Sequence, residues 1–550
     1  MNPSDQDTFD YLIVGAGTAG CVLANRLSAD SGVRVGLVEA GPSDDHFTIR
    51  IPAAVAAAIA RPEFSWGYKS APQRHLNNRQ IPLPRGRVLG GCSSINGMVY
   101  FRGHPADFDD WAAGGATGWS YREVLPYFIR SENNEAWSRS PVHGHGGPMN
   151  VIDIARPNPL IKRFLAATAA LGYKHCEDFS GGDPEGFGPR QATIRNGHRE
   201  SMVTAYLNPV RNQQNLSVIT NALVTRILIE GQRATGIEIE RAGARQRLLA
   251  RKEVLVCAGS YGSPQLLLLS GVGEGSALQA LGIEVKHHLP GVGASLHDHP
   301  AAAIQMRTQD STSYGLSLKA LPRDLWNIAE YALFRRGPLG SNVFEATGFV
   351  KTRPELPRPD LQIVFMPAHR NASGYPIPLG HGYGIIAIAV RPKSRGRVSL
   401  ASADPHQAPV IDPNFLDAPE DLQTLLFGTQ LGRRILATPA FESLHATELL
   451  PGEKVQDERS WTEYIRNGVV TVHHPSGTCR MGSDELAVVD PQLRVRGIAG
   501  LRVVDASVFP SAIAGNSNAA VVMTAEKAAD LMLSRSTATA TNVSKPVAVA

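Results

Sequence analysis

The sequence predicts an α/β protein of two domains, and three observations lead to that prediction. Residues 9–14 form a short apolar run, a glycine turn follows, and the small and apolar residues from 18 to 27 are typical of a buried helix. A second strand, turn and helix are predicted at 252–273, much later in the chain. From 301 to 470, prolines and short alternating apolar runs indicate a second, α+β domain on a mostly antiparallel sheet.

The first of these units has the glycine spacing of a dinucleotide site. Gly15, Gly17 and Gly20 stand in the pattern G-x-G-x-x-G between the strand and the helix. In that pattern the first glycine allows the sharp turn, the second lets the backbone approach a pyrophosphate, and the third lets the helix pack on the strand. Residues 34–38 predict a second strand, and Glu39 at its end is placed to bind a ribose hydroxyl. An acidic residue there favours FAD or NAD over NADP.

The composition is that of a soluble globular protein and excludes several other classes. The chain has 550 residues, of which 43% are hydrophobic and 19% charged, and its formal net charge of +4 is too dilute to predict a nucleic-acid partner. The five cysteines are odd in number and widely spaced, which favours reduced thiols in a cytoplasmic protein. The longest strongly apolar stretch, 52–60, is far short of the ~20 residues that cross a bilayer. No transmembrane span is predicted, whereas peripheral contact with the inner membrane stays open.

Between the two strand–turn–helix units the chain alternates loops, helices and strands. Residues 82–103 are dense in glycine, serine and asparagine, so this loop presents backbone N–H groups that could wrap the far half of a cofactor. A plain surface loop is the alternative. Helices are predicted at 107–111 and 121–132, and strands at 217–229 and 234–240.

Two groups of histidines invite a metal interpretation. The glycine-rich break 143–149 holds two histidines without a third ligand nearby, and His297, Asp298 and His299 follow one another later in the chain. For the second group, a polar loop that makes its own hydrogen bonds is favoured. No metal site is predicted.

The late return to the strand–turn–helix pattern implies that the first domain is discontinuous, with other segments inserted between its pieces. We expect it to comprise 1–157, 205–305 and 468–533, and the second domain to comprise 158–204 and 306–467. The tail 534–550 is built from small and polar residues that cannot form a packed core, so it is expected to be disordered.

Five stretches of the chain together resemble the glucose–methanol–choline (GMC) oxidoreductases, which are FAD enzymes that oxidise alcohols. These are the two strand–turn–helix units, the glycine-rich loop, and the segments 469–482 and 501–532. Residues 86–96 and on to Trp111 resemble the first signature of the family, with Cys92 where the strict pattern has glycine, serine or threonine. Residues 259–273 resemble the second signature.

The resemblance spans residues 8–533 and points to the bacterial choline dehydrogenase-like and aliphatic alcohol dehydrogenase branch of the family. It implies a discontinuous Rossmann-like FAD-binding domain joined to a substrate-binding domain.

The resemblance also implies roles for individual residues. His474 matches the catalytic histidine of the family, and Asn518 matches the second active-site residue, which is histidine or asparagine among relatives. Some relatives attach FAD through a histidine where this loop has Ile95, so FAD is expected to be bound without a covalent bond. The implied cofactor contacts are Gly15, Gly17, Thr18, Ala19, Gly20, Glu39, Ala40, Arg87, Gly90, Gly91, Asn96, Gly97, Met98, Val99, Val224, Ala258, Gly259, Asp505, Ala506 and Asn518.

Alcohol oxidation by a flavin removes a hydride from carbon and a proton from oxygen, so the site needs a base beside the hydroxyl. Histidine suits that role because its ordinary pKa of about 6.5 leaves it mostly neutral at pH 7. The Asn518 amide offers a donor and an acceptor, and it stands where a helix is predicted to begin, whose positive end could stabilise reduced flavin. Neighbouring His473 is expected to point the other way, and Cys479 to be a buried thiol.

The sequence therefore predicts an FAD-dependent enzyme that oxidises a primary alcohol to the aldehyde and passes electrons to a quinone or another carrier. A choline dehydrogenase and an oxygen-using oxidase are the nearer alternatives, and a flavin-containing lyase or decarboxylase is a more distant one. A nucleotide-binding structural protein is disfavoured by the histidine and asparagine pair.

The expected substrate has an uncharged, largely apolar body, with choline as the second choice. Residues 341–350 resemble a choline dehydrogenase stretch and put Glu345 beside Phe344. A carboxylate and aromatic faces are the parts of a site for a quaternary ammonium group. Alternatively, Glu345 accepts backbone hydrogen bonds and has no contact with the substrate.

Overall fold

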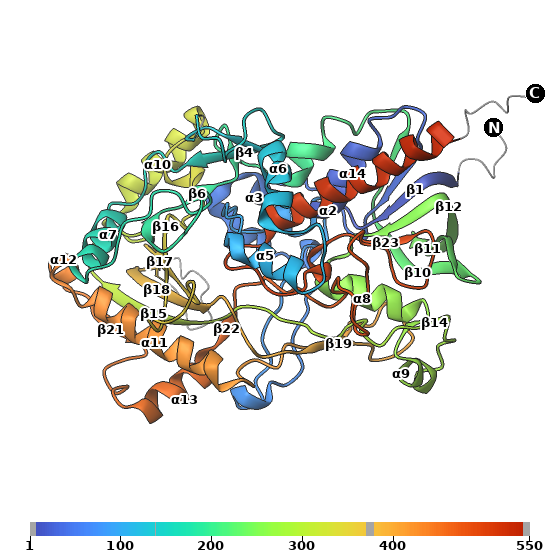
Figure 1. Ribbon diagram of the computed structural model, residues 1–550. Helices are drawn as coiled ribbons and strands as arrows, with labels where there is room; N and C mark the ends of the chain where they lie inside the picture. Colours follow the sequence, from blue (N-terminus) through green and yellow to red (C-terminus); the bar gives the residue numbers. More distant parts are fainter. Residues whose placement is uncertain (1–6, 138, 370–378, 543–550) are drawn as a thin grey trace, which may run out of the picture.

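The computed structural model describes residues 7–137, 139–369 and 379–542, and two large sheets dominate it. In Figure 1 the mainly parallel sheet lies on the right and the antiparallel sheet on the left. This arrangement confirms the predicted fold class.

The parallel sheet is formed by strands from three distant parts of the chain. Strand β1 (Thr8–Val14) pairs in parallel with β2 (Val35–Val38) on one side and with β12 (Ala244–Val256) on the other. Strand β9 (Leu216–Ile219) pairs with β2, and β23 (Leu501–Val503) pairs with β12, both in parallel. The chain thus returns to one sheet after long insertions, as the sequence predicts.

Two antiparallel strands extend this sheet at one edge. Strand β11 (Arg233–Arg241) pairs with the first half of β12, and β10 (Ala222–Glu230) pairs with β11. The prediction of one strand over 217–229 is wrong, because β9 and β10 occupy different places in the sheet. The break falls at Asn221, whose φ of 54° turns the chain in a left-handed conformation that asparagine tolerates better than most residues.

Helices cover the parallel sheet. Helix α2 (Thr18–Leu27) follows the glycine turn, α8 (Gly259–Leu269) follows β12, and α14 (Asn518–Asn542) follows β23. Helix α14 packs on α2 and on α6 (Tyr121–Ser131), and Figure 1 shows it as the long red helix above the sheet.

Helix α14 extends further along the chain than the sequence predicts. The sequence predicts a disordered tail from residue 534, but α14 continues through Asn542, and residues 543–550 lie outside the described part of the chain. Residues 534–542 contain neither glycine nor proline, so nothing in them breaks a helix.

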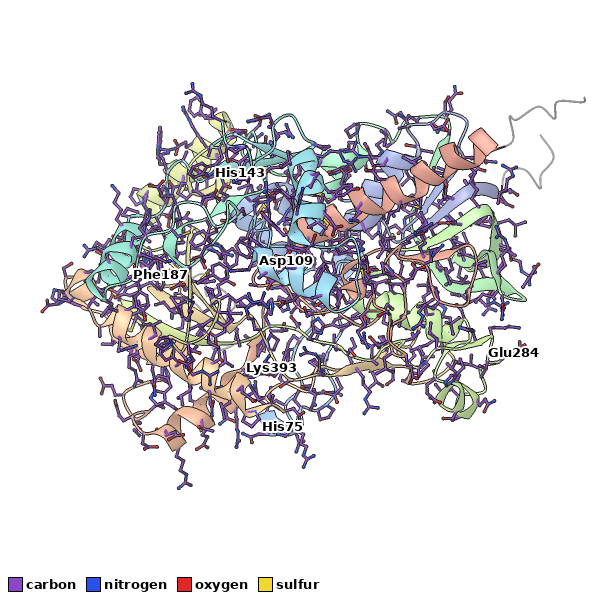
Figure 2. The ribbon with its side chains drawn as sticks, in the orientation of Figure 1. His75, Asp109, His143, Phe187, Glu284 and Lys393 are labelled. Carbon is purple, nitrogen blue, oxygen red and sulfur yellow. The ribbon has the colours of Figure 1, made fainter. Side chains whose placement is uncertain are left out.

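The second large sheet is antiparallel, as the sequence predicts for this part of the chain. Its strands lie in the order β16, β17, β18, β15 and β21, with β22 also paired to β15. In that order they span Ala346–Val350, Leu361–Met366, His381–Ala389, Pro300–Thr308, Thr447–Leu450 and Val470–Thr471. Helix α11 (Pro419–Leu436) packs on this sheet. Phe187, labelled in Figure 2, belongs to the core of this part.

Strand β15 begins at Pro300, so the predicted domain limit between 305 and 306 falls inside it. The division of the chain into the two predicted sets of segments stays a prediction.

The remaining helices and strands lie between these elements along the chain. Between β2 and β9 they are α3 (Phe47–Arg50), η1 (Pro52–Ala54), α4 (Val55–Ile59), η2 (Pro62–Phe64), η3 (Arg74–Leu76), η4 (Gly91–Ser94), α5 (Pro105–Ala113), β3 (Glu132–Asn134), β4 (Met149–Asp153), α7 (Leu160–Ala170), β5 (Gly186–Pro189), β6 (Gln191–Ala192), β7 (Ile194–Arg195), β8 (His198–Arg199) and η5 (Val203–Leu207). Later in the chain they are β13 (Val272–Gly273), α9 (Gly275–Ala280), β14 (His287–His288), α10 (Leu321–Phe334), η6 (Pro338–Gly340), β19 (Arg397–Ser399), β20 (Val410–Asp412), α12 (Pro439–Glu442), α13 (Glu458–Gly468) and η7 (Ala506–Val508).

His143, also labelled in Figure 2, belongs to a buried hydrogen-bond network. Its ring nitrogens lie 3.0 Å from Glu132 Oε1 and 3.0 Å from Asp178 Oδ2. Across the described ranges no group of three or more histidine, cysteine, aspartate or glutamate residues is arranged to hold a metal ion. In the same ranges no helix is long and apolar enough to cross a membrane.

Candidate active site

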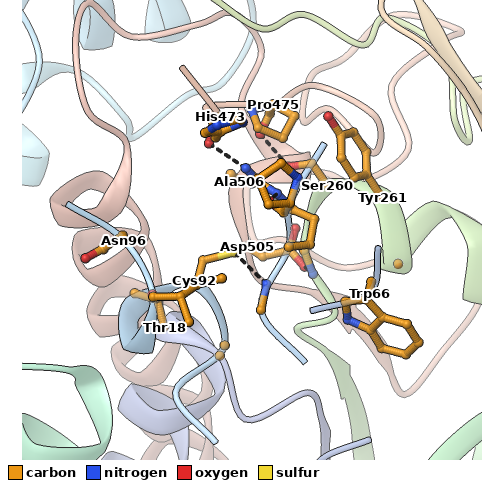
Figure 3. A pocket seen from close by; sticks show the side chains of 18 of the residues that line it. Thr18, Trp66, Cys92, Asn96, Ser260, Tyr261, His473, Pro475, Asp505 and Ala506 are labelled. Carbon is orange, nitrogen blue, oxygen red and sulfur yellow. Dashed lines mark hydrogen bonds between the residues drawn. The ribbon is translucent and has the colours of Figure 1, made fainter. Parts of the chain in front are cut away.

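A cavity of about 530 Å³ is lined by residues from both large sheets (Figure 3). The parallel sheet contributes the ends of β1, β2 and β12 together with the turns that follow them. The antiparallel sheet contributes Gln362, Val364, Ile386 and Ile388. The volume is in the range of cofactor and small-molecule sites.

The glycine turn has the shape that a pyrophosphate requires. Gly15 has a φ of +96°, and a Cβ there would lie 2.6 Å from the carbonyl oxygen of Cys257. A Cβ on Gly20 would lie 1.9 Å from the carbonyl oxygen of Gly15, so this glycine allows the helix to pack on the turn. Gly17 differs, because its nearest neighbour would be 4.0 Å away and it lines the cavity. The missing side chain of Gly17 therefore leaves room for a ligand.

Glu39 lies at the end of β2, where the sequence predicts the ribose contact. Its Oε2 accepts a hydrogen bond from the backbone N–H of Ala16 at 2.9 Å, and its Oε1 accepts one from that of Gly41 at 2.8 Å. The side chain lines the cavity, and burial raises the pKa of its carboxyl to about 7. The turn and this carboxyl together fit the adenosine half of a dinucleotide.

The glycine-rich loop closes over the far half of the cavity. Gly90 and Gly91 have φ values of +83° and +53°, and the N–H of Gly90 donates to the carbonyl of Ala16 at 2.7 Å, which joins this loop to the first turn. Buried Arg199 donates to the carbonyl and the side-chain oxygen of Asn96 at 2.6 and 3.0 Å. Sequence reasoning missed Arg199, which lies about a hundred residues from the loop that it holds.

Most of the residues predicted to contact the cofactor line the cavity. These are Gly15, Gly17, Thr18, Ala19, Glu39, Ala40, Gly91, Asn96, Gly97, Met98, Val99, Val224, Ala258, Gly259, Asp505, Ala506 and Asn518. Gly20, Arg87 and Gly90 do not. The two glycines shape the turns instead, and the exposed Arg87 has its guanidinium 5.1 Å from the ring centre of Trp66.

His474 lies on the loop after β22 and lines the cavity. Its backbone N–H donates to Asp298 Oδ1 at 2.7 Å, and its Nδ1 lies 3.1 Å from Nδ1 of His299. Thr471 donates to the other oxygen of Asp298 at 2.5 Å. The His-Asp-His segment therefore holds the predicted catalytic histidine in place, a role that its sequence did not indicate.

Asn516, rather than Asn518, contacts the histidine. Nδ2 of Asn516 lies 3.1 Å from Nε2 of His474, whereas Oδ1 of Asn518 accepts a hydrogen bond from Thr18 Oγ1 at 2.8 Å. Asn516, which sequence reasoning did not single out, is therefore the amide beside His474. Asn518 lines the same cavity, and its assignment as the second active-site residue stays a prediction. Asn518 is the first residue of α14 and joins it to the start of α2, and Gly515, with a φ of +87°, turns the preceding chain toward His474.

Arg190 fixes the direction of this hydrogen-bond chain. Its Nη2 donates to Oδ1 of Asn516 at 2.9 Å, and because arginine has no acceptor, the amide must present its Nδ2 donor to His474. Nε2 of His474 is then the acceptor, and the ring proton sits on Nδ1, which faces His299. The nitrogen of His474 beside Asn516 is thus free of a proton.

Burial keeps His474 in the neutral state. It lowers the pKa of the ring well below the ordinary value, and the positive charges of Arg85 and Arg190 act in the same direction. Burial also lowers the pKa of His299 to about 4. His474 is therefore a neutral base at pH 7.

The expected orientation of the His473 side chain is wrong. Its φ of +69° turns the side chain, so that it lines the cavity beside His474 instead of pointing the other way. The carbonyl of His473 accepts from Arg85 Nη2 at 2.9 Å, and Ser260 Oγ donates to the carbonyl of Pro475 at 2.6 Å (Figure 3). Two contacts therefore hold the backbone on either side of the base.

Of the two residues predicted to contact substrate, the structure brings only one to the cavity. Phe344 lines it, and Glu345 does not. Glu345 is 1% exposed and accepts hydrogen bonds from Tyr314 Oη at 2.8 Å, Ser341 Oγ at 2.7 Å and the backbone N–H of Asn158 at 2.7 Å. The alternative interpretation, in which this carboxylate accepts backbone and neighbouring donors, matches these contacts.

The glycine turn, the acidic residue at the end of β2 and a neutral histidine beside the same cavity define a dinucleotide-dependent oxidoreductase. Comparison with known proteins gives the family, because the pattern described as GMC oxidoreductase matches residues 9–301 and 392–525. The chain belongs to the GMC oxidoreductase family, and its cofactor is FAD.

Individual relatives cover almost the whole chain. An alcohol dehydrogenase [acceptor] of Pseudomonas putida is 41% identical, with 96% of both chains covered. An oxygen-dependent choline dehydrogenase of Rhizobium etli is 42% identical, again over 96% of both. Among solved structures, pyridoxine 4-oxidase from Mesorbium loti has a TM-score of 0.85 at 30% identity, covering 95% of this chain and 98% of the other. A variant of Aspergillus oryzae formate oxidase has a TM-score of 0.90 at 28% identity, with coverages of 97% and 99%.

Proposed function

We propose that this protein oxidises a primary alcohol to the aldehyde, with His474 as the base. The observation that carries the proposal is the unprotonated Nε2 of His474, which lies beside the Asn516 amide on the wall of the cavity. A relative that is 41% identical has the name alcohol dehydrogenase [acceptor], which supports the same reaction.

The residues of the chain have separable tasks in this reaction. Bound FAD supplies the acceptor for the hydride that leaves the carbinol carbon. His474 Nε2 takes the hydroxyl proton, and Nδ2 of Asn516 donates to the oxygen as negative charge develops on it. The contact with His299 holds the imidazole in the tautomer that this transfer needs.

We propose further that FAD is held without a covalent bond. Ile95, which stands where some relatives have the linking histidine, packs in an apolar cluster with Ile49, Phe64 and Val88. The side chain has no nucleophilic atom. FAD should therefore leave the protein on acid precipitation, and flavin that stays in the washed pellet would contradict this part of the proposal.

Choline is a poor fit to this cavity. A quaternary ammonium group is bound by aromatic faces and a carboxylate. Among the described residues, the carboxylates that line the cavity are Glu39 and Asp505, both predicted cofactor contacts, and Glu345 is turned away. The buried guanidinium of Arg190 lies beside the base, where it would repel a cation.

We propose that electrons pass to a membrane quinone and that helix α10 touches the bilayer. Every exposed residue of α10 is apolar, including Leu325, Trp326 and Leu333 at 58%, 62% and 72% exposure. Exposed Lys319 and Arg336 flank the helix and suit anionic headgroups. Helix α10 leads into η6, which packs on η1, and Ala53 of η1 lines the cavity. This series of contacts connects the apolar surface of α10 with the active-site cavity.

The test of the proposed reaction is anaerobic reduction of bound FAD by a series of alcohols, followed in the flavin absorbance. With the best alcohol, His474→Ala is expected to slow reduction by roughly 10²-fold or more while FAD stays bound, because a positioned base contributes about that much. His381→Gln is the matched control, since His381 is buried but does not line the cavity. Equal rates for wild type and His474→Ala would show that His474 is not the base. If no alcohol reduced the bound FAD, the proposed function would be wrong.

A further inference from the structure

Arg190 is a buried cation on the wall of the active site. It follows β5, is 6% exposed, and lines the cavity together with Phe344, Val364 and Ile388. Its Nη2 donates to Asn516 Oδ1 at 2.9 Å, which places the guanidinium one amide away from the base. Among the described residues this is the single hydrogen bond of the Arg190 guanidinium, which has five N–H donors.

No carboxylate neutralises this charge. Within the described ranges no aspartate or glutamate lies at ion-pair distance from Arg190, and the internal undescribed residues, 138 and 370–378, include no acid. Two other buried arginines are paired with carboxylates, Arg102 with Glu132 and Arg502 with Glu253. Buried Arg199 has no carboxylate partner but donates to the backbone carbonyls of Ile49, Ser93 and Asn96, whereas the guanidinium of Arg190 has a single acceptor. Burial lowers the pKa of Arg190 to about 9, so it still carries its charge at pH 7.

A buried charge without a counter-ion is unfavourable, which indicates that an anion belongs in this place. The other N–H groups of the Arg190 guanidinium have no hydrogen-bond partner among the described residues, but protein atoms do not enclose them fully. They therefore face open space. Arg190 borders the active-site cavity and a second hollow of about 10 Å³, which is too small for more than a water molecule. The cavity is therefore where an anion can meet these donors.

We propose that Arg190 forms an anion-binding subsite and that the substrate is a hydroxy acid, a primary alcohol whose carboxylate lies a few bonds from the carbinol carbon. The proposal rests on the proposed alcohol oxidation and names its substrate class. Nη2 of Arg190 and Nε2 of His474 each lie about 3 Å from the same amide, so they are at most about 8 Å apart. A short hydroxy acid spans that distance, with its methylene groups against Phe344 and Val364.

The reaction balances with the carboxylate unchanged. The O–H bond breaks and its proton goes to His474 Nε2, the C–H bond breaks and its hydrogen leaves with two electrons to FAD, and a C=O bond forms. The product is the aldehyde of the same acid. Arg190 binds the carboxylate before and after the transfer and takes up no proton itself. Its hydrogen bond to Asn516 affects every alcohol alike, so the preference between two substrates reports on the anion subsite alone.

The experiment compares substrates of matched size on the FAD-loaded enzyme. Anaerobic flavin reduction is measured with 4-hydroxybutanoate, 1-butanol and choline, in wild type, Arg190→Met, Arg190→Lys and Phe344→Leu. Wild type should prefer 4-hydroxybutanoate over 1-butanol in kcat/KM, and Arg190→Met should lower that preference roughly 10- to 100-fold, the usual range for a hydrogen bond to a charged group. Arg190→Lys should restore part of it. Phe344→Leu alters the wall without altering charge, so it should change both substrates alike.

A second measurement separates this inference from the proposed function. Butanoate cannot be oxidised as an alcohol, so its Kd is measured from the change that it causes in the flavin spectrum. Wild type should bind butanoate roughly 10- to 100-fold more tightly than Arg190→Met does. Equal binding, or an unchanged ratio of the two substrates in Arg190→Met, would overturn the subsite while the alcohol oxidation stands. Reduction by no alcohol, with butanoate still bound through Arg190, would overturn the reaction and leave the subsite.

Discussion

An arginine at one end of a hydrogen-bond chain decides the state of the active-site histidine. Because Arg190 can only donate, Asn516 must turn its carbonyl oxygen toward it and its Nδ2 toward His474. The proton of His474 is thereby kept on Nδ1, and Nε2 is ready to accept one from a substrate. At the scale of residues, a side chain that the reaction does not consume thus sets the tautomer of the base.

This arrangement predicts different results for two neighbouring asparagines. Asn516→Ala should slow flavin reduction at saturating alcohol by roughly 10²-fold, because a donor to the developing alkoxide is lost. Asn518→Ala should slow it far less, since its amide lies against Thr18. Anaerobic stopped-flow absorbance of the flavin measures both rates. If Asn518→Ala slowed flavin reduction more than Asn516→Ala did, Asn518 would be the active-site asparagine.

Buried neutral histidines also predict how stability depends on pH. Burial lowers the pKa of His297 to about 3, and both of its ring nitrogens are buried without a partner in the described structure. The unfolded chain takes up a proton at this residue below about pH 6.5, but the folded protein does not, so stability falls as pH falls through that value. Between pH 7.5 and 5.5 this one residue should cost ~1.4 kcal/mol of unfolding free energy.

Urea unfolding of wild type and His297→Gln at the two pH values measures this cost. The wild type should lose more stability on acidification than the variant, whatever the difference between the two at pH 7.5. The same loss in both proteins would mean that His297 is protonated in the folded state.

The sequence identifies those site residues that belong to motifs. It does not identify residues that reach the site from distant parts of the chain. His474 is recognisable because its neighbours form a family pattern, and the glycines because their spacing has a mechanical reason. Arg190 and Arg199 have no such pattern, since each acts on a partner that is distant in sequence. Sequence reasoning misses the contact of Asn516 with His474 for another reason, because where α14 begins, relative to the turn at Gly515, is a property of the folded chain.

At the scale of elements, the strand, turn and helix from β1 to α2 assign different tasks to the three glycines. Gly15 and Gly20 avoid clashes with the backbone of the protein itself, because a Cβ at these positions would lie 2.6 and 1.9 Å from a carbonyl oxygen. Gly17 has an ordinary φ of −76° and an open cavity in front of it. Two of the glycines are therefore required for folding, and one for the ligand.

Substitution by valine should separate these tasks. Gly17→Val should give a folded protein that lacks FAD, because the new side chain points into the pyrophosphate space without meeting protein atoms closer than 4.0 Å at its Cβ. Gly20→Val should fail to fold or lose several kcal/mol, roughly the cost of severe overpacking. Circular dichroism reports the fold, and the ratio of flavin to protein absorbance reports FAD. Normal FAD content in Gly17→Val would show that the cofactor does not approach this turn.

Elements are predictable from sequence where a local pattern fixes them. The runs before and after the glycine turns form β1, α2, β12 and α8 because apolar periodicity and turn residues agree there. The sequence does not separate β9 from β10, since a single asparagine with a left-handed backbone is a weak local signal. It also places the end of α14 too early, because small polar residues suit both a helix and a disordered tail.

At the scale of the whole molecule, an apolar surface and a redox site lie on one chain. The outer face of α10 exposes leucine, isoleucine, tryptophan and phenylalanine side chains that folding leaves in water. Exposed apolar patches are typical of interaction sites, and the basic neighbours of this one suit the anionic lipid surface that we propose as its partner. An enzyme that docks there could deliver electrons to a quinone dissolved in the bilayer.

Paired charge substitutions test this docking. The double variant Leu325→Glu with Trp326→Glu should bind vesicles of phosphatidylglycerol and phosphatidylcholine at least roughly 10²-fold more weakly than wild type, since each buried side chain contributes about 2 kcal/mol. Leu249→Glu with Leu486→Glu makes the same change of charge at exposed leucines outside α10 and should bind as wild type does. Vesicle flotation measures binding.

Turnover with a long-chain quinone in the vesicles should fall in the α10 variant, while turnover with a water-soluble acceptor should not, because no residue of α10 lines the cavity that holds the base. Equal flotation of all three proteins would remove α10 as the membrane contact.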